Sequence, residues 1–447
     1  MSAAQSETTL EAKLKKLQCH FTWDLDGNQS ILLGEREMLE DIGTDEGNCW
    51  LGHIYNLQGY IHFQLGTNEA NEARSFFSMA AEALNRTRDA DRGPWLLVNY
   101  GNLAWLHYRQ GEETESQAYL SKVAALKEEF PSPSQDELHP EICAEKAWTL
   151  LKFSREHKVL AGEYFQKAIG MQPDMVEWQT SHLIGWASLH KHDKNQLGAD
   201  FMERMQNAKE QDPDNLYLAA VYLRRRASRG EDVNDEVSEL ATRILGNPVS
   251  SYSGIKVMLR IYRSDDSFDK ATALAEEALQ NHPDKRYLKR CLALCYRWKI
   301  NSMDHPTPQM IDKVISLHKQ VITLYPHSSL VKRMDLASVY AQSRHDLGKA
   351  EAIYQELFKR DLQPADKQVL YNSYAKFLNF KWKDRNGSMD YHMKAVEIPL
   401  ESFYRQNSIK ALEKIRDRGK NHRCREIKQF LDDCEHHSDP RDITFLP

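Results

Sequence analysis

The sequence of 447 residues contains no apolar run long enough for a membrane-spanning helix, and its polar first ten residues contain no signal-peptide core. These two absences predict a cytoplasmic protein that makes no contact with membranes. Glycine (20) and proline (15) are few and stand between helix-forming stretches, and no long alternating β-type pattern interrupts those stretches. The sequence therefore predicts an all-α protein.

Catalytic and metal-binding signatures are absent as well. The chain has no phosphate-binding glycine loop, no dinucleotide fingerprint, no H-E-x-x-H and no G-x-S-x-G. Its seven cysteines are odd in number and scattered, and Cys291 and Cys295, one helical turn apart, have no second pair nearby to complete a zinc site. His190 and His192 are two residues apart and would lie on different faces of a helix. We therefore expect no enzyme activity, no cofactor and no metal.

What the sequence does contain is a regular series of prolines. Before several of them, a small residue is followed four residues later by an apolar or aromatic residue and then, three residues later, by Ala, as in Ala161–Phe165–Ala168. This pattern is typical of the second helix of a tetratricopeptide repeat, a unit of about 34 residues that ends at a proline. The prolines are 35 to 43 residues apart: Pro173, Pro213, Pro248, Pro283, Pro326, Pro364 and Pro399. We predict a tetratricopeptide-repeat superhelix, an α-solenoid of about eight helix-turn-helix repeats, whose function lies on a concave surface.

Two stretches interrupt this repeat rhythm. One is Phe-Pro-Ser-Pro-Ser at 130–134, and the other is a polar segment at 301–308. They predict three parts: an N-terminal segment with the first repeats (1–135), central repeats with a binding groove (136–300), and C-terminal repeats with a basic helical end (301–447). A further polar loop is expected at 229–236.

Charge is unevenly distributed along the chain. The net charge of −6 argues against indiscriminate binding of nucleic acid by the whole surface. Residues 1–50 carry ten acids and four Lys or Arg, whereas residues 252–299 carry ten Lys or Arg and six acids. This asymmetry permits a local positive groove, although solvated helix faces are the more common origin of such counts.

Aromatic and basic residues occur together in the central repeats. Trp148 and Lys152 are one helical turn apart, Tyr217 begins a helix, and Lys256 and Arg260 follow on the next helix of the same class. Aromatic rings stack on unpaired bases and Lys or Arg neutralise phosphate, so the pattern suits single-stranded RNA. The alternative is that Trp148 and Tyr217 belong to the core between repeats.

A family resemblance bears on this choice. Residues 17–25 read Leu-Gln-Cys-His-Phe-Thr-Trp-Asp-Leu, and the segments 100–105, 145–153, 212–217 and 374–377 continue a likeness in register to about residue 420. The sequence resembles the interferon-induced proteins with tetratricopeptide repeats, the IFIT family. The resemblance implies a non-catalytic antiviral effector that binds the 5′ end of non-self single-stranded RNA, or a scaffold that acts through related family members or other proteins.

The resemblance also implies a binding site. Lys152 would meet the 5′ phosphates, Trp148 and Leu151 would border the pocket, and Tyr217 would contact the RNA. Three positions depart from the family pattern, because an arginine is replaced by Ser188, a tyrosine by Val257 and a glutamine by Cys291. With the basic residues of the later helices, the expected RNA-binding residues are Trp148, Leu151, Lys152, Glu177, Ile184, Tyr217, Lys256, Arg260 and Arg290. Which RNA 5′ end is preferred does not follow from the sequence.

Overall fold

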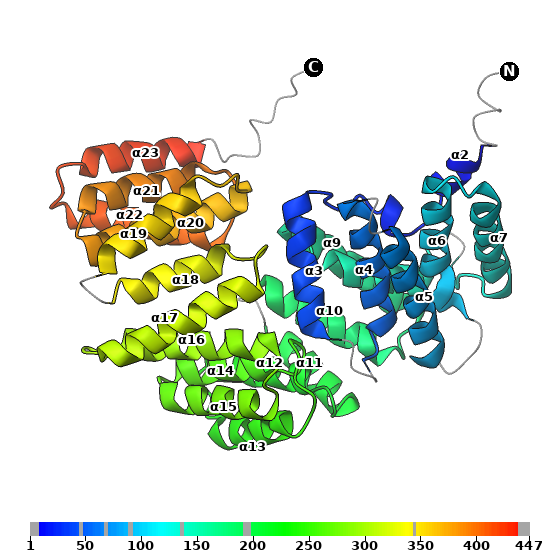
Figure 1. Cartoon of the computed structure of the whole chain (residues 1–447), viewed down its shortest axis with the longest axis horizontal. Coiled ribbons are helices and arrows are strands. Elements are labelled where there is room, and N and C mark those ends of the chain that lie inside the picture. Colours follow the sequence, from blue (N-terminus) through cyan, green and yellow to red (C-terminus); the bar gives the residue numbers. More distant parts are fainter. Residues whose placement is uncertain are drawn as a thin grey trace. The chain divides into compact units, whose positions relative to one another are not determined.

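The computed structural model describes residues 9–43, 48–66, 70–87, 93–134, 138–190, 198–342 and 346–436. Within these ranges the regular structure is entirely helical, as expected (Figure 1). The chain divides into two compact units, Met1–Leu288 and Lys289–Pro447, and the division falls within helix α16 (Arg286–Ser302). The expected division into three parts stays a prediction.

The first unit opens with three elements that precede the repeats: α2 (Leu10–Lys15), a 3-10 turn at His20–Thr22 and α3 (Gln29–Ile42). The turn carries the Cys-His-Phe-Thr-Trp motif, and Cys19 and Trp23 are buried. His20 donates its backbone N–H to Asn102 Oδ1 (3.1 Å), and its ring nitrogens lie 3.0 Å from Asn102 Nδ2 and 3.1 Å from Thr149 Oγ1. Burial lowers the pKa of His20 to about 3 and so keeps the ring neutral. The motif therefore ties the N-terminus to two later helices.

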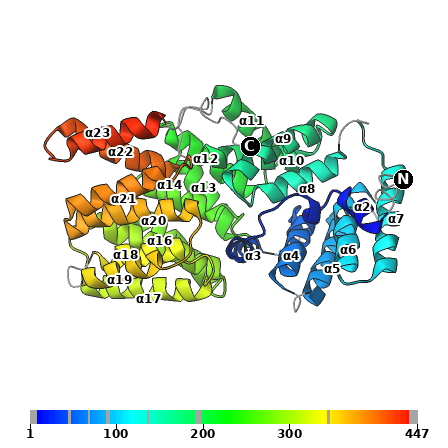
Figure 2. The ribbon, with the colours of Figure 1, turned by 90° about the horizontal axis from the view of Figure 1, so that it is seen from above.

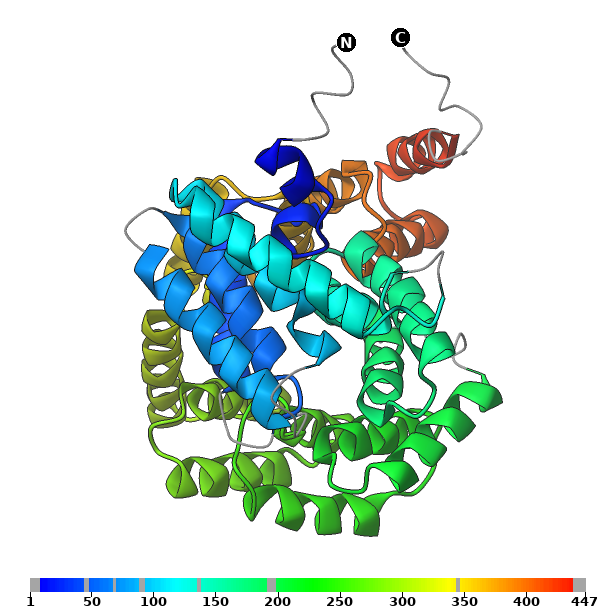
Figure 3. The ribbon, with the colours of Figure 1, turned by 90° about the vertical axis from the view of Figure 1, so that its right-hand side faces the viewer.

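Helical hairpins follow one another through the first unit. They are α4 (Leu51–Leu65) with α5 (Ala70–Thr87), α6 (Leu97–Arg109) with α7 (Glu113–Glu129), α8 (Pro140–Leu150) with α9 (Arg155–Met171), α10 (Val176–Leu189) with α11 (Ala199–Gln211), α12 (Leu216–Ser228) with α13 (Asn234–Leu245), and α14 (Ile255–Ser264) with α15 (Phe268–Asn281). In Figure 3 the blue α4–α5 hairpin lies beside the cyan α6–α7 hairpin. The expected loop at 229–236 is shorter than predicted, because α13 already begins at Asn234.

Small residues explain why the two helices of a hairpin approach closely. A Cβ atom added to Gly59 in α4 would lie 2.7 Å from Phe77 Cε1 in α5, so only glycine fits beside that ring. The predicted pattern in α9 is likewise internal, since Ala161, Phe165 and Ala168 are all buried. The tetratricopeptide-type packing inferred from the sequence is confirmed in these repeats.

Most of the regularly spaced prolines stand just beyond the second helix of a hairpin, as Pro173 does after α9. Pro364 differs, because it is the first residue of α20 (Pro364–Phe377) and not the end of the preceding helix. Proline is well tolerated there, since the first residue of a helix has no intrahelical partner for its N–H group. The prediction that this proline closes a repeat was wrong.

The second unit continues with the same construction. Beyond α16 it contains α17 (Pro308–Leu324), α18 (Leu330–Tyr340), α19 (Leu347–Phe358), α20, a π-helical turn at Leu378–Trp382, α21 (Arg385–Glu397), α22 (Phe403–Arg418) and α23 (Cys424–His436). Figure 2 shows α20, α21, α22 and α23 packed in succession. The basic C-terminal segment therefore forms helices with a core of its own, to which Met389, Leu412 and Leu431 contribute.

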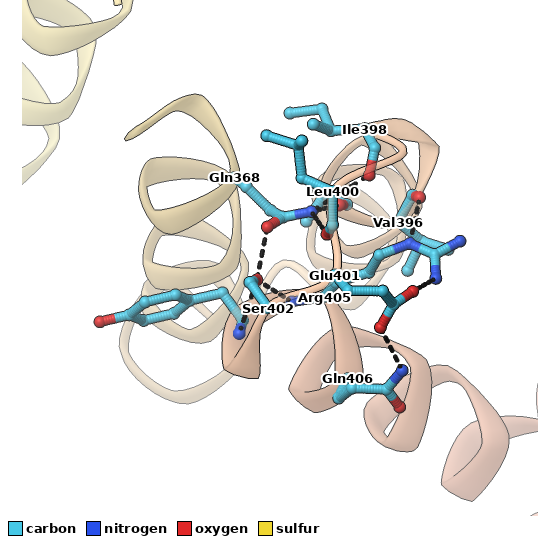
Figure 4. Close-up of polar contacts among 10 residues, drawn as sticks. Gln368, Val396, Ile398, Leu400, Glu401, Ser402, Arg405 and Gln406 are labelled. Atoms are coloured by element: carbon cyan, nitrogen blue, oxygen red, sulfur yellow. Dashed lines mark hydrogen bonds and ion pairs between the residues drawn. The ribbon is translucent and has the colours of Figure 1, made fainter. Parts of the chain in front are cut away.

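A buried amide joins α20 to the segment that follows α21 (Figure 4). The fully buried Gln368 donates from Nε2 to the carbonyl oxygens of Ala395 (3.1 Å), Ile398 (3.2 Å) and Leu400 (3.1 Å). Its Oε1 accepts a hydrogen bond from the Ser402 hydroxyl. A neutral side chain thus satisfies the carbonyls left over at the end of α21.

Candidate functional site

The end of α8 places an enclosed lysine over a tryptophan. Lys152 lies two residues beyond the end of α8, and its backbone N–H donates to Thr149 O at 2.9 Å. One turn from Trp148, it extends its ammonium to 4.0 Å from the centre of the indole ring. Trp148 is 1% exposed and stacks on Trp50 at 5.8 Å, whereas Lys152 is 9% exposed. The tryptophan is therefore core, as the alternative interpretation held, and at the same time it holds the lysine by a cation–π contact.

Lys152 also reaches a residue one hundred positions further along the chain. Its Nζ donates to the hydroxyl of Tyr252 at 2.6 Å. Tyr252 lies in the loop before α14, and that loop is fixed by the N–H of Ser251, which donates to the carbonyl of Asp41 at the end of α3 (2.8 Å). The Tyr252 ring packs 5.6 Å from that of Tyr217 on α12. The loop that contains Tyr252 thus links Lys152 to α3 and to α12.

Burial and a nearby carboxyl have opposite effects on the protonation of Lys152. Burial lowers the pKa of Lys152 to about 7, and the carboxyl of Glu35 on α3 opposes that shift. Burial likewise raises the pKa of Glu35 to about 7, opposed by Lys152 and by Lys158 on α9. The Oε2 atom of Glu35 is buried and accepts no hydrogen bond from the residues that the structure describes. Both charges of the pair are therefore held at a cost, and a bound anion would stabilise the charged lysine.

A close approach of α14 to α12 builds the adjoining wall. Gly254 adopts a left-handed conformation (φ +87°) at the start of α14, and a Cβ atom there would lie 2.9 Å from the carbonyl of Leu216. Lys256 and Arg260 follow one turn apart on α14, and both are half-buried. The pKa of Tyr217 is raised by burial and by Tyr252, and Arg260 acts in the opposite direction. Tyr217 is therefore within electrostatic reach of the α14 arginine.

Helix α10 contributes a less polar side. Leu151 packs against Gly185, where an added Cβ atom would lie 2.8 Å from Leu151 Cδ2. Glu177 lies half-buried in the first turn of α10, and Ile184 packs against an apolar cluster that includes Leu183. Ser188 is exposed and donates its hydroxyl to Gly185 O at 2.8 Å, so this position supplies no positive charge.

Only some of the predicted RNA-binding residues are linked to one another by contacts in the structure. The contacts above join Trp148, Lys152, Tyr217 and Arg260 in the first unit, with Lys256 on the same helix as Arg260. Arg290 lies in the second unit, where its guanidinium is 5.5 Å from the ring centre of Tyr325. Two open hollows on the first unit, one between α11, α12 and α13 and one between α10 and α11, share no lining residue with the predicted set.

The residues expected from the sequence do not include Glu35, Lys158, Arg224 or Tyr252. Arg224 is half-buried on α12, two turns after Tyr217. The run of three arginines at 224–226 is the sequence feature from which it could have been found. Nothing local marks Glu35, because its partners lie more than a hundred residues away.

Within the described part of the chain, no helix is both long and apolar enough to cross a membrane, and no group of three or more His, Cys, Asp or Glu residues is arranged to hold a metal ion.

Comparison with known proteins gives one consistent answer, although no family model matches the chain. The antiviral innate immune response effector IFIT1 of Macaca fascicularis is 27% identical over 436 residues, which is 93% of this chain and 89% of that protein. Human interferon-induced protein with tetratricopeptide repeats 2 is 26% identical over 427 residues, 92% of this chain and 88% of that protein.

Among solved structures, a monomeric mutant of IFIT1 with Gppp-AAAA has a TM-score of 0.73 at 23% identity and covers 96% of this chain and 100% of its own. The human IFIT1 dimer with PPP-AAAA has a TM-score of 0.72 at 24% identity and covers 96% of each chain. The fold is therefore the tetratricopeptide-repeat α-solenoid of these structures. The resemblance stated from the Cys-His-Phe-Thr-Trp motif is confirmed, and the chain is similar to the interferon-induced proteins with tetratricopeptide repeats over more than nine-tenths of its length.

Proposed function

We propose that this protein is a non-catalytic, cytoplasmic antiviral effector that binds the 5′ end of non-self single-stranded RNA in its first unit. The relatives named above support the antiviral role, and the solved structures that share the fold hold short RNAs with 5′ phosphate groups. The observation that carries the proposal to this chain is the enclosed Lys152, whose ammonium lies 4.0 Å from the centre of an indole ring, donates to a phenol and is under the electrostatic influence of the Glu35 carboxyl.

A lysine in this state suits phosphate better than an exposed lysine does. A phosphate that enters beside Lys152 restores the charged form of the amine, and the interaction is strong because little water screens it. We assign the 5′ phosphates to Lys152 and the pocket walls to Trp148 and Leu151. Glu177 and Ile184 continue that wall along α10. Tyr217 contacts the first nucleotides, and Lys256 and Arg260 neutralise the phosphates that follow.

Ser188 bears on which 5′ end is bound. The site lacks a cation at this position, and losing one charged phosphate contact in a confined site costs roughly 1.5–3 kcal/mol, about ten- to a hundredfold in affinity. We therefore expect binding that depends on 5′ phosphate but is weaker than a site with a further arginine at position 188 would give.

A direct titration tests the proposal. The purified protein is mixed with RNAs of one sequence that carry a 5′-triphosphate, a cap or a 5′-hydroxyl, at two salt concentrations. We expect salt-sensitive binding that distinguishes the three ends, because neutralised phosphates release counterions. Equal and feeble binding to all three RNAs would contradict the proposal.

A second candidate function is a scaffold for related family members or other proteins. Exposed aromatic side chains on the second unit favour it, since Phe380 is 64% and Trp382 45% exposed around the π-helical turn. If the titration fails, substitution of both aromatic residues by Ser should reduce binding of a protein partner without affecting the fold.

A further inference from the structure

Three consecutive arginines on α12 differ in what holds them. The guanidinium of Arg225 donates to the carbonyl oxygens of Ala187 and His190, the latter at 3.3 Å. Arg226 forms ion pairs with Glu231 and Glu236, both at 2.6 Å. The side chain of Arg224 has no hydrogen bond or ion pair with any residue in the described ranges. Arg225 and Arg226 thus maintain the fold, and Arg224 is left available.

The position of Arg224 places it on the wall of the candidate site. It follows Tyr217 by seven residues, which is two helical turns, so both side chains lie on one face of α12. That face meets Lys152 through the Tyr217–Tyr252 ring contact and the Lys152–Tyr252 hydrogen bond of 2.6 Å. The tight approach at Gly254 brings α14, with Arg260, against α12.

The charges on this wall repel one another. Burial and the neighbouring charges of Arg260 and Arg225 together lower the pKa of Arg224 to about 10, while Tyr217 acts in the opposite direction. Arg263 acts in the same direction as Arg260, and Arg224 forms no ion pair with a carboxylate in the described part of the chain. Guanidinium groups that share a half-buried surface without a carboxylate gain most from a multivalent anion, and a planar guanidinium matches phosphate oxygens in pairs.

We propose that Arg224, together with Arg260, holds a phosphate group of the bound RNA and forms a second phosphate site on the wall that begins at Lys152. This inference rests on the proposed function, and it adds a residue that lies outside the site expected from the sequence. The phosphate comes either from the 5′ terminus or from an internal phosphodiester of the same strand.

The test compares Arg224→Gln with Arg226→Gln, which removes the same charge from the next position of the same helix. Dissociation constants are measured for 5′-triphosphate and 5′-hydroxyl RNAs of one sequence at several salt concentrations. We expect Arg224→Gln to weaken binding about tenfold and to lower the salt dependence by the contribution of about one phosphate, while Arg226→Gln stays within about twofold. Arg224→Lys keeps the positive charge but loses the paired N–H donors of the guanidinium, so its dissociation constant should lie between those of the two glutamine variants. This variant controls for a folding defect in Arg224→Gln.

The pattern of losses identifies the phosphate. A larger loss with the triphosphate RNA assigns Arg224 to the 5′ terminus, and an equal loss with both RNAs assigns it to the internal backbone. If Arg224→Gln binds as tightly as the wild type while Lys152→Glu does not bind, the second phosphate site is wrong and the proposed function stands. If the wild type binds none of the RNAs, both proposals fail.

Discussion

Each unit buries a lysine over an aromatic ring, and the two lysines have different surroundings. Lys152 lies 4.0 Å from the ring centre of Trp148 and Lys332 lies 4.4 Å from that of Tyr325, and they are 9% and 7% exposed. Lys332 donates to the carbonyl (2.6 Å) and hydroxyl (2.9 Å) of Ser328, one turn before it on the chain. Lys152 instead donates to the phenol of Tyr252 from a distant segment, and the Glu35 carboxyl acts on it electrostatically without an ion pair in the described part of the chain. A buried lysine over a ring is therefore not a site by itself, and its partners make the difference.

The same contrast holds for buried side chains that could carry negative charge. In the first unit Glu145 is 1% exposed, accepts from Asn56 Nδ2 at 2.8 Å, and lies 3.8 Å from His53 Nε2. In the second unit a similarly buried side chain, Gln368, is a neutral amide that donates to main-chain carbonyls. Glu145 and Gln368 thus represent two choices for a buried polar side chain, an ionisable acid in the first unit and a neutral amide in the second.

The largest expected effect comes from reversing that choice at Gln368. Gln368→Glu replaces a donor to three carbonyl oxygens by a carboxylate oxygen, so the variant buries a charge that faces three acceptors. We expect the free energy of unfolding at neutral pH to fall by about 3–5 kcal/mol, as measured by urea denaturation. Gln320→Glu, the same change on an exposed position of α17, should change it by less than about 0.5 kcal/mol. Equal effects of the two changes would show that the network in Figure 4 does not hold α20 in place.

Glu145→Gln tests the opposite exchange. Burial raises the pKa of Glu145 from 4.5 to about 8, so the folded protein keeps the proton that the unfolded chain releases in this range. The stability that the protonated acid contributes is complete below about pH 4.5 and is lost as pH rises through 8. We expect the variant to be indistinguishable from the wild type near pH 5 and more stable by on the order of 3 kcal/mol near pH 8, in parallel denaturant titrations. A constant difference across this range would mean that Glu145 is ionised in the folded protein.

Substitutions of Lys152 and Lys332 should have different effects on RNA binding. Lys152→Glu should abolish RNA binding, a loss of at least about a hundredfold, because it places a carboxylate where the phosphate is expected and next to Glu35. Lys332→Met should leave RNA affinity unchanged. It should lower the melting temperature, because it removes the ammonium group that donates to the carbonyl and hydroxyl of Ser328 just before α18. Lys428→Glu, on an exposed position of α23, should weaken RNA binding only slightly. If the Lys332 variant is fully folded and nevertheless does not bind RNA, the assignment of RNA binding to Lys152 and not to Lys332 is wrong.

How far the sequence predicts this molecule depends on the range of the interactions. The hairpins were predictable because Ala161, Phe165 and Ala168 follow a local period that repeats along the chain. Trp148 and Lys152 were found because one helical turn separates them. The hydrogen bond from Lys152 to Tyr252 and the electrostatic effect of Glu35 could not be derived, since each joins segments a hundred or more residues apart. The sequence around Tyr252 or Glu35 gives no local indication of such a distant partner.

The role of Arg224 was hidden for a different reason. Three arginines in a row predict a basic surface, but their partners decide which of them is available, and those partners lie on other helices or in the following loop. Pro364 shows the same limit at the level of the backbone, because a proline is compatible with the end of one repeat and with the first turn of the next.

The smallest expected effect concerns the balance between Lys152 and Glu35. Both groups titrate near neutral pH, and as pH rises each loses a proton, so the pair changes from a net charge of +1 to −1. RNA affinity should therefore fall from pH 6 to pH 8. Glu35→Gln removes the carboxylate that competes with phosphate for Lys152 and Lys158, so the variant should bind like the wild type at pH 6 and about threefold more tightly at pH 8.

The comparison between variant and wild type at each pH cancels the titration of the RNA itself. Glu128→Gln, the same change at an exposed position of α7, serves as the control for net charge and should alter affinity equally little at both pH values. If Glu35→Gln and Glu128→Gln behave alike, Glu35 does not face the bound anion. Lys152 would then be tuned by burial alone, and the contrast with Lys332 would be reduced to their hydrogen-bond partners.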